Sequence, residues 1–213
     1  MVFIFYSLKN NFHKSLTVLL SVLYLLVCLI TFRIAYNIVP FIIVVSSMIL
    51  IDRLEKNTFS FNGFNIFKAL KYAILSYLVS LVISFIYVLI LMNTNFKIKD
   101  QKIINEMLDF SVNKFIFMAL IIIIVAPVVE EFVFRWFLYN RVFKKYIGIY
   151  LGAILSSALF GFVHLNIKSF VAIMVLGIIN CWLINNKGYW YAVFNHAFFN
   201  SISVMMLFLN RVY

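Results

Sequence analysis

Acidic residues, proline and cysteine are all scarce in this chain. Of its 213 residues, seven are Asp or Glu, two are Pro and two are Cys, while 18 are Lys or Arg. Cys28 and Cys181 lie in apolar segments without the spacing of metal ligands, so we interpret both as small buried hydrophobic residues. Charged residues make up 12% of the chain and hydrophobic residues 65%, a composition typical of a polytopic membrane protein.

The net charge of +11 does not indicate nucleic-acid binding. The Lys and Arg residues are dispersed over the breaks between apolar runs and form neither a basic face nor an aromatic platform for bases. Basic loops at the membrane surfaces instead contact anionic lipid headgroups. We therefore expect the lipid bilayer as a partner, and no nucleic acid.

Long apolar runs fill most of the chain, and a helix needs about 20 such residues to cross a bilayer. The runs are 15–32, 34–51, 72–92, 115–138, 147–165, 169–184 and 190–209. The predicted fold is all-α, a polytopic transmembrane helix bundle of about seven spans (six to eight). We expect a single membrane domain over residues 1–213.

The distribution of Lys and Arg over the breaks gives an orientation. The breaks on the side of the N-terminus carry more of these residues than the breaks on the opposite side. Because basic loops are retained inside, the sequence predicts a multi-pass protein of the cell membrane with a cytoplasmic N-terminus.

The informative charges lie inside one apolar run. Glu130 and Glu131 are the only acidic residues in a predicted span, and Arg135 follows in the same run. The other acids fall in polar breaks, at Asp52, Glu55, Asp100, Glu106 and Asp109. A charge at the centre of a bilayer costs on the order of 3 kcal/mol, so three in one span indicate a function.

Helical spacing separates these three charges into two groups. Glu131 and Arg135 are four residues apart, so they can pair on one face of a helix. Glu130 points about 100° away and is free to address another group. Pro127 loosens the backbone hydrogen bonding just upstream. A buried ion pair that locks helices together would explain Glu131 and Arg135, but it leaves Glu130 unexplained.

Two further spans carry polar side chains. His164 follows Phe160 by one helical turn, and His196 and Asn200 share a face of the last span. Each of these alone is explained by hydrogen bonding between helices. Their combination with Glu130 in one small membrane protein indicates a shared site.

These residues support two kinds of chemistry. Glu130 and His164 could hold and deprotonate a water, while His196 and Asn200 donate hydrogen bonds to the oxyanion of a cleaved peptide bond. Alternatively, Glu130, His164 and His196 offer two nitrogens and one oxygen, a ligand set that suits catalytic zinc with an open water position. Residue types alone do not separate the two.

The order Glu-Glu-x-x-x-Arg, Phe-x-x-x-His, His-x-x-x-Asn on successive apolar segments resembles the CPBP family of intramembrane proteases. The resemblance covers about residues 127–207 and rests on Glu130, Glu131, Arg135, Phe160, His164, His196 and Asn200. It implies a helical catalytic core within residues 115–209 that opens to the cytoplasmic side. It also implies cleavage of a peptide, or of the C-terminal or leader segment of a membrane-associated protein, by glutamate-activated water with no bound metal. Glu131, Arg135 and Phe160 would support the site.

The depth of His164 adds a constraint. If a regular helix began at Lys145 on one membrane surface, His164 would lie roughly 29 Å from that surface and so near the opposite one. Glu130 would lie near the middle of the membrane. We therefore expect residues 146–152 to lie along the membrane interface and the span to begin near Ala153.

Two other functions fit the same residues. A bacteriocin self-immunity or scaffold protein would keep the site but act by binding without hydrolysis. A transporter would use the polar cluster as a proton relay, but the sequence shows no repeat symmetry of the kind that transporters have.

Overall fold

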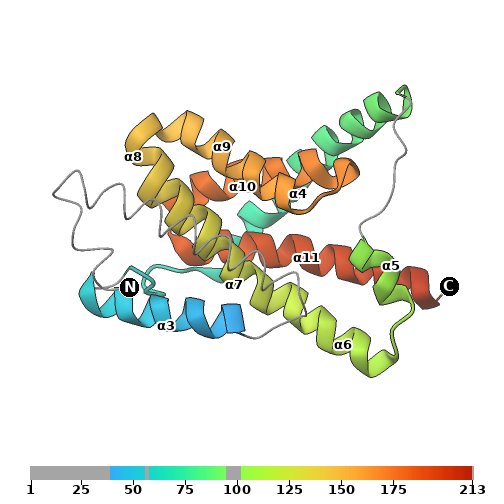
Figure 1. Ribbon diagram of the computed structural model, residues 1–213, viewed down its shortest axis with the longest axis horizontal. Coiled ribbons are helices and arrows are strands. Elements are labelled where there is room, and N and C mark those ends of the chain that lie inside the picture. Colours follow the sequence, from blue (N-terminus) through green and yellow to red (C-terminus); the bar gives the residue numbers. More distant parts are fainter. Residues whose placement is uncertain (1–38, 56–57, 95–101, 213) are drawn as a thin grey trace. The chain divides into compact units, whose positions relative to one another are not determined.

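The computed structural model describes residues 39–55, 58–94 and 102–212 (Figure 1). These ranges contain helices and turns and no β-strand, so the predicted all-α fold is confirmed. The first predicted span, 15–32, and the start of the second lie outside the described residues.

The chain divides into two compact units, Met1–Ser60 and Phe61–Tyr213. In the first unit, Met1–Ser60, the described part is helix α3 (Val39–Leu54) and the turn that follows it. Oδ1 of Asp52 accepts a hydrogen bond of 3.0 Å from the backbone N–H of Phe59, which closes that turn. The second unit, Phe61–Tyr213, holds all the candidate site residues. The single domain expected over the whole chain stays a prediction.

Four helices of the second unit are long and apolar enough to cross a membrane. They are α4 (Ile66–Met92), the continuous helix Val112–Ile147, α10 (Ile167–Asn186) and α11 (Tyr189–Val212). A fifth apolar helix, α9 (Ile149–Val163), has 15 residues. The large apolar side chains that α4 leaves exposed form the kind of surface that faces lipid. The predicted multi-pass helix bundle is therefore confirmed, with four full-length spans among the described residues.

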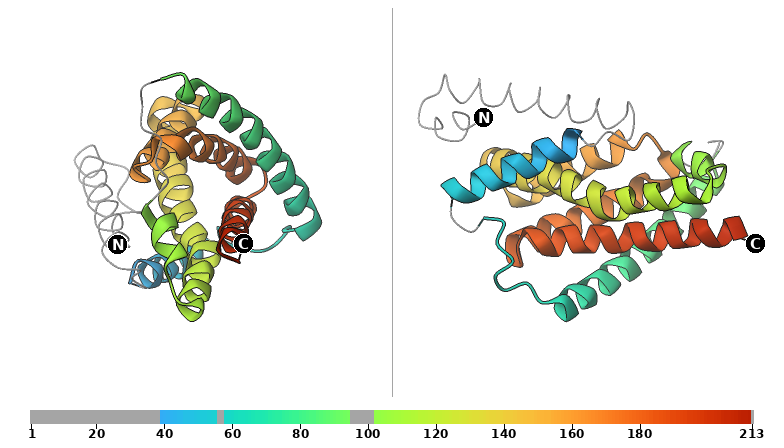
Figure 2. Two further views of the ribbon diagram at one scale, coloured as in Figure 1. Left: turned by 90° about the vertical axis from the view of Figure 1, so that its right-hand side faces the viewer. Right: turned by 90° about the horizontal axis from the view of Figure 1, so that it is seen from below.

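Helix α11 is the central element of this unit. It packs against α4 and α10 on one side and against the helix Val112–Ile147 on the other (Figures 1 and 2). Helices α9 and α10 form an antiparallel hairpin that packs on the end of the same long helix. This arrangement brings three segments that are distant in sequence, near residues 130, 160 and 196, around one region of the interior.

The helix Val112–Ile147 alternates between α-helical and π-helical turns. It comprises α6 (Val112–Leu120), the π-helical η1 (Ile121–Val125), α7 (Ala126–Glu130), the π-helical η2 (Glu131–Phe143) and α8 (Lys144–Ile147). Pro127 lies in the first turn of α7, directly after η1. Proline has no N–H to donate and its ring crowds the preceding turn, so a wider turn accommodates it. Glu130 lies between the two π-helical segments and Glu131 begins the second, and such segments often occur at functional sites.

Two glycines reverse the chain between helices. Gly148, with φ of 86°, separates α8 from α9, and Gly188, with φ of 104°, separates α10 from α11. Both lie in the left-handed region that glycine adopts without steric cost. Helix α9 begins at Ile149, before the expected start of the fifth span at Ala153, and the expected position of residues 146–152 along the membrane interface stays a prediction. Since α9 is short and ends at Val163, His164 is the residue that follows its last turn.

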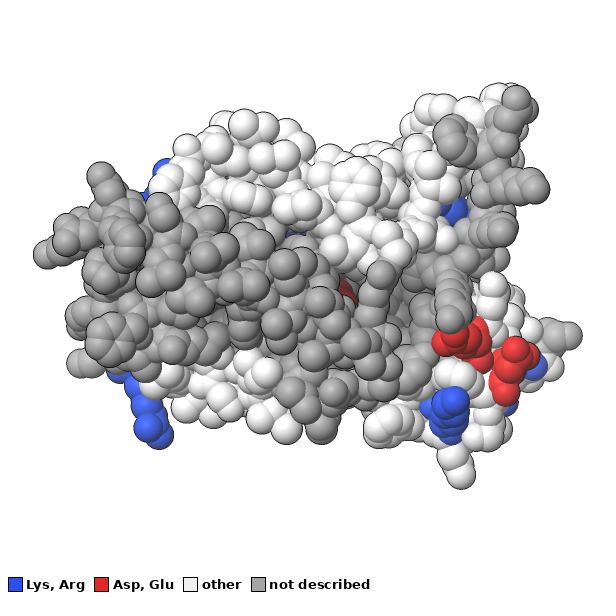
Figure 3. All heavy atoms as spheres, in the orientation of Figure 1, with Lys and Arg blue, Asp and Glu red and all other residues white. Residues whose placement is uncertain are grey.

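Charged side chains of the second unit gather at the ends of its helices. Figure 3 shows acidic and basic groups over α5 (Lys102–Leu108) and the start of α6, whereas the visible surface of α9 and α10 is nearly uncharged. In this region Nζ of Lys114 lies 3.8 Å above the ring of Phe110.

Candidate active site

A buried ion pair lies at the start of η2. Nε of Arg135 is 3.4 Å from Oε2 of Glu131, and both side chains are fully buried. Cζ of Arg135 also lies 3.9 Å above the ring of Phe160, a cation–π contact from η2 to α9. Residues four apart still share a face of the helix in η2. The spacing therefore brings Glu131 and Arg135 together as the sequence predicts.

Gly177 of α10 leaves the space that the guanidinium occupies. A Cβ atom at this position would lie 2.8 Å from Nη2 of Arg135 and 2.7 Å from both Cβ and Oγ of Ser157. Real Cβ atoms do not approach other heavy atoms so closely, so any other residue at 177 would displace Arg135 or α9. The ion pair is therefore enclosed by three helical elements, η2, α9 and α10.

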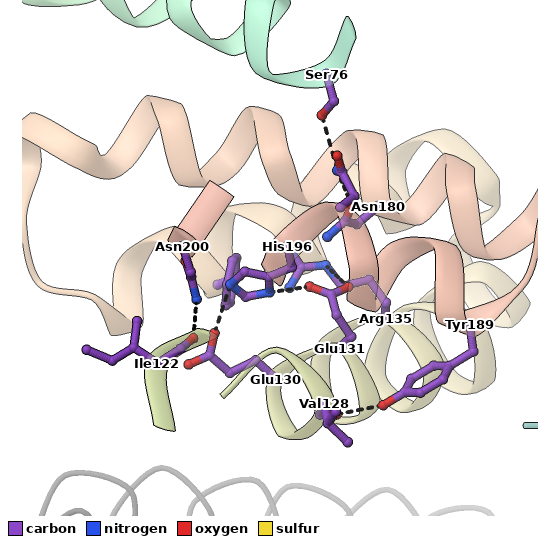
Figure 4. A network of polar contacts seen from close by, with 12 residues as sticks. Ser76, Ile122, Val128, Glu130, Glu131, Arg135, Asn180, Tyr189, His196 and Asn200 are labelled. Atoms are coloured by element: carbon purple, nitrogen blue, oxygen red, sulfur yellow. Dashed lines mark hydrogen bonds and ion pairs between the residues drawn. The ribbon is translucent and has the colours of Figure 1, made fainter. Parts of the chain in front are cut away.

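His196 lies between the two adjacent carboxylates (Figure 4). Its Nδ1 is 2.8 Å from Oε1 of Glu131, and its Nε2 is 3.5 Å from Oε2 of Glu130. We expected Glu130 to point away from Glu131 and to address a different group. Instead, both carboxylates address the same imidazole, because its two nitrogens lie on opposite edges of the ring.

The two glutamates differ in exposure. The side chain of Glu131 is fully buried, whereas that of Glu130 is 14% exposed. Glu131 therefore has the position of a group that orients an imidazole and pairs with an arginine. Glu130 has the position of a group that a water molecule or a substrate can reach.

His164 lies beside Phe160, not against Glu130. Its ring makes an edge contact with the ring of Phe160 at a centroid distance of 4.8 Å, and His196 contacts the same ring at 5.6 Å. Nδ1 of His164 is 2.7 Å from the carbonyl oxygen of Phe160. A carbonyl can only accept, so this nitrogen carries the proton, and Nε2 of a neutral ring is left as an acceptor. Glu130 and His164, both described residues, make no direct ion-pair contact with each other.

Asn200 uses part of its amide to hold the central helix. Nδ2 donates a hydrogen bond of 2.8 Å to the carbonyl oxygen of Ile122 in η1 (Figure 4). This carbonyl lies in the wide turn before Pro127, where the regular backbone ladder is interrupted. An amide has two N–H groups, so one donor of Asn200 serves Ile122 and the second remains for a ligand.

The alternative set of zinc ligands is Glu130, His164 and His196. Among residues 39–55, 58–94 and 102–212, no three His, Cys, Asp or Glu side chains are gathered closely enough to hold a metal ion. Glu130 and His196 are neighbours, but His164 lies across the ring of Phe160 from His196. The described residues therefore do not gather this ligand set, and we derive no step through zinc, which stays a prediction.

A second polar cluster lies next to the site and was missed from the sequence. Nδ2 of Asn195 donates to Oδ1 of Asn180 at 2.6 Å and to Oγ of Ser76 at 3.1 Å, and all three side chains are buried. The signal that revealed Glu130, polarity inside an apolar run, also applies to Asn180 and Asn195. We overlooked it because an asparagine has no charge to mark it as costly.

Comparison with known proteins agrees with the three motifs. Residues 112–202 match the protein family described as "Type II CAAX prenyl endopeptidase Rce1-like". A protein of Bacillus subtilis (strain 168), named "Putative membrane peptidase YdiL", is 28% identical over 90 residues. That match covers 42% of this chain and 36% of the relative, so the chain spans about a third of the relative's length. No solved structure matches significantly.

The matched segment begins with α6 and ends within α11, so it contains every candidate site residue. The helical membrane fold, the motif order and these matches agree with the resemblance to the CPBP family of membrane proteases that the motifs predicted.

Proposed function

We propose that this protein is an intramembrane endopeptidase that cleaves a peptide, or the C-terminal or leader segment of a membrane-associated protein, with water as the nucleophile. The observation that carries the proposal is the partly exposed carboxylate of Glu130 beside the imidazole of His196, whose other nitrogen is held by buried Glu131. A carboxylate that solvent can reach, next to an oriented imidazole inside a membrane helix, suits proton transfer.

Glu130 is the general base of this proposal. Its carboxylate takes a proton from water, the oxygen attacks the carbonyl carbon of the scissile peptide, and the C–N bond breaks as the proton passes to the departing nitrogen. Base catalysis of this kind contributes roughly 10²–10⁴-fold to a rate. The 14% exposure of Glu130 supports this role over Glu131, which is fully buried.

The two histidines take different roles. Nε2 of His164 can accept a hydrogen bond from the attacking water, because Nδ1 is committed to the carbonyl of Phe160. His196, whose ring is oriented by Glu131, donates from Nε2 to the oxyanion when it is protonated on both nitrogens, together with the second N–H of Asn200. These roles need the substrate carbonyl to lie between Glu130, His164 and Asn200.

The charges at the two ends of the second unit support a proposed orientation in the membrane. Contacts such as Lys144 to Asn185 (2.7 Å) and Lys187 above the ring of Tyr72 (5.5 Å) show that several helix ends share one end of the bundle. The cations at this end are Lys68, Lys71, Arg141, Lys144, Lys145 and Lys187. The opposite end mixes Lys114, Lys168 and Arg211 with Glu106 and Asp109. We place the purely basic end in the cytoplasm.

A cleavage assay with the purified protein in lipid vesicles tests the proposal. The substrates are membrane-anchored peptides with varied C-terminal and leader sequences. Mass spectrometry identifies the products. The Glu130→Gln variant keeps the size and hydrogen bonding of the side chain but cannot accept a proton, and Asp109→Asn, at the end of the bundle, is the matched control. We expect cleavage by the wild type and the control, none by Glu130→Gln, and no effect of a metal chelator on any of them.

Two results would contradict the proposal. Cleavage that persists in Glu130→Gln would remove the base from the mechanism. Wild-type protein that binds a peptide without cutting it, and whose Glu130→Gln variant binds equally, would favour the binding role of an immunity or scaffold protein. Loss of cleavage on chelation, restored by added zinc, would contradict the metal-free mechanism alone.

A further inference from the structure

Polar contacts with neighbouring helices hold α11 in place. In a bilayer, lipid tails are as apolar as leucine side chains, so apolar contacts alone do not strongly fix the rotation of a helix. Close packing and hydrogen bonds between helices do so instead. The polar contacts of α11 are therefore the groups that decide where His196 points.

Helix α11 has polar contacts on two faces. On the face toward the central helix, the hydroxyl of Tyr189 donates to the carbonyl of Val128 at 2.6 Å, and His196 and Asn200 make the contacts described above. On the other face, the hydroxyl of Tyr191 accepts a hydrogen bond of 3.0 Å from the N–H of Asn65, and Asn195 lies one turn further along. The helix is thus held from both sides.

Asn195 makes the deepest of these contacts. Its exposure is 1%, and its amide nitrogen joins three helices by donating to Asn180 of α10 and Ser76 of α4. Asn180 is 0% exposed and Ser76 is 4% exposed. A buried donor shared between two acceptors on different helices fixes both the rotation and the height of α11.

We infer that Asn195 is a positioning residue that sets the imidazole of His196 between Glu130 and Glu131. Asn195 precedes His196 directly, and the two side chains point about 100° apart on a rigid helix. Any rotation or shift of α11 that Asn195 prevents would move His196 by a similar amount. A displacement of about 1 Å in a catalytic group can cost about 100-fold in rate. The expected loss of cleavage rate rests on the proposed function, whereas the placement of the His196 ring by Asn195 does not.

Stability and positioning are separated by a pair of variants. Asn195→Leu leaves the Asn180 amide buried without its partner, which costs stability. The double variant Asn180→Leu/Asn195→Leu replaces both polar partners by apolar groups of similar size, which is close to neutral for stability. Ser76 can return its hydroxyl to its own helix. Ser201→Ala is the matched control, because the Ser201 hydroxyl bonds only within α11, to the carbonyl of Ala197 at 2.7 Å.

The experiment compares the full-length variants in lipid vesicles by thermal unfolding, by kinetics and by ¹⁵N NMR of labelled histidine. The chain has three histidines, so the signals of His196 are assigned from a His196→Gln variant. We expect the double variant to recover the unfolding temperature of the wild type, to keep a kcat at least tenfold lower with KM within twofold, and to show altered His196 nitrogen shifts. Ser201→Ala should match the wild type in all three.

A kcat that recovers together with stability, or His196 shifts unchanged in the double variant, would overturn the inference. The NMR measurement needs no peptidase activity. If the protein cleaves nothing, the proposed function fails, while the altered or unaltered His196 signals still decide whether Asn195 positions this ring.

Discussion

Nδ1 of His196 lies 2.8 Å from Oε1 of Glu131, across 65 positions of sequence. This contact joins the last helix to the central one and directs the second nitrogen of the ring toward Glu130. The adjacent glutamates therefore lie in different environments, because one is buried against Arg135 and the other is partly exposed.

The ion pair beneath His196 should be required for stability. Arg135→Met leaves the buried Glu131 without its cation, and breaking a buried pair by removing one partner costs about 3–5 kcal/mol. We expect a correspondingly lower unfolding temperature in detergent, measured by circular dichroism. Lys145→Met, at an exposed position, is the control. An Arg135→Met protein as stable as this control would show that the pair does not hold the helices.

Glycine at position 177 should be required for activity. The Cβ atom of Gly177→Ala would press on Arg135 and Ser157, and overpacking of this kind costs about 1–3 kcal/mol. Gly161→Ala is the matched control, because the new Cβ atom would lie 2.9 Å from the ring of Phe170 at the same α9–α10 interface.

We expect both glycine variants to lose stability and only Gly177→Ala to lose kcat beyond that loss, because only Gly177 contacts the arginine that pairs with Glu131. Cleavage rates and unfolding temperatures measured side by side check this. Equal kcat values in the two variants would show that the space around Arg135 does not matter to the site.

The sequence predicted the chemical groups of the site better than their pairing. The i,i+4 spacing correctly predicted the contact between Glu131 and Arg135. It did not predict that Glu130 faces His196 and not His164, since that depends on how α9 and α11 pack beside the central helix. The angle of about 100° assumed between neighbouring residues also belongs to an α-helix, whereas η2 begins at Glu131.

The short α9 explains a second difference. Hydropathy predicted a span at residues 147–165 but not the residue at which the chain turns before it. The expected depth of His164 in the membrane then shifted the predicted start to Ala153. The turn is made at Gly148, whose positive φ no periodicity reveals. The buried contacts of Asn195 were equally hidden, because they depend on the lateral order of three helices.

The orientation of the bundle can be measured directly. In a background with Cys28→Ser and Cys181→Ser, the exposed positions Lys145 and Lys114 are replaced singly by cysteine. Because the purely basic end should face the cytoplasm, a membrane-impermeant maleimide should label Lys114→Cys in intact cells and Lys145→Cys only after permeabilisation. The reverse pattern would contradict the proposed orientation.

The joint action of Glu130 and His196 is tested most directly by a double-mutant cycle. Single-turnover cleavage is measured for the wild type, Glu130→Gln, His196→Gln and the double variant in the same vesicles. Groups that act as one unit have strongly non-additive effects. We predict that each single variant loses at least about 100-fold and that the double variant is no slower than the slower single variant. Losses that multiply in the double variant, or a single variant with full activity, would contradict a shared catalytic centre.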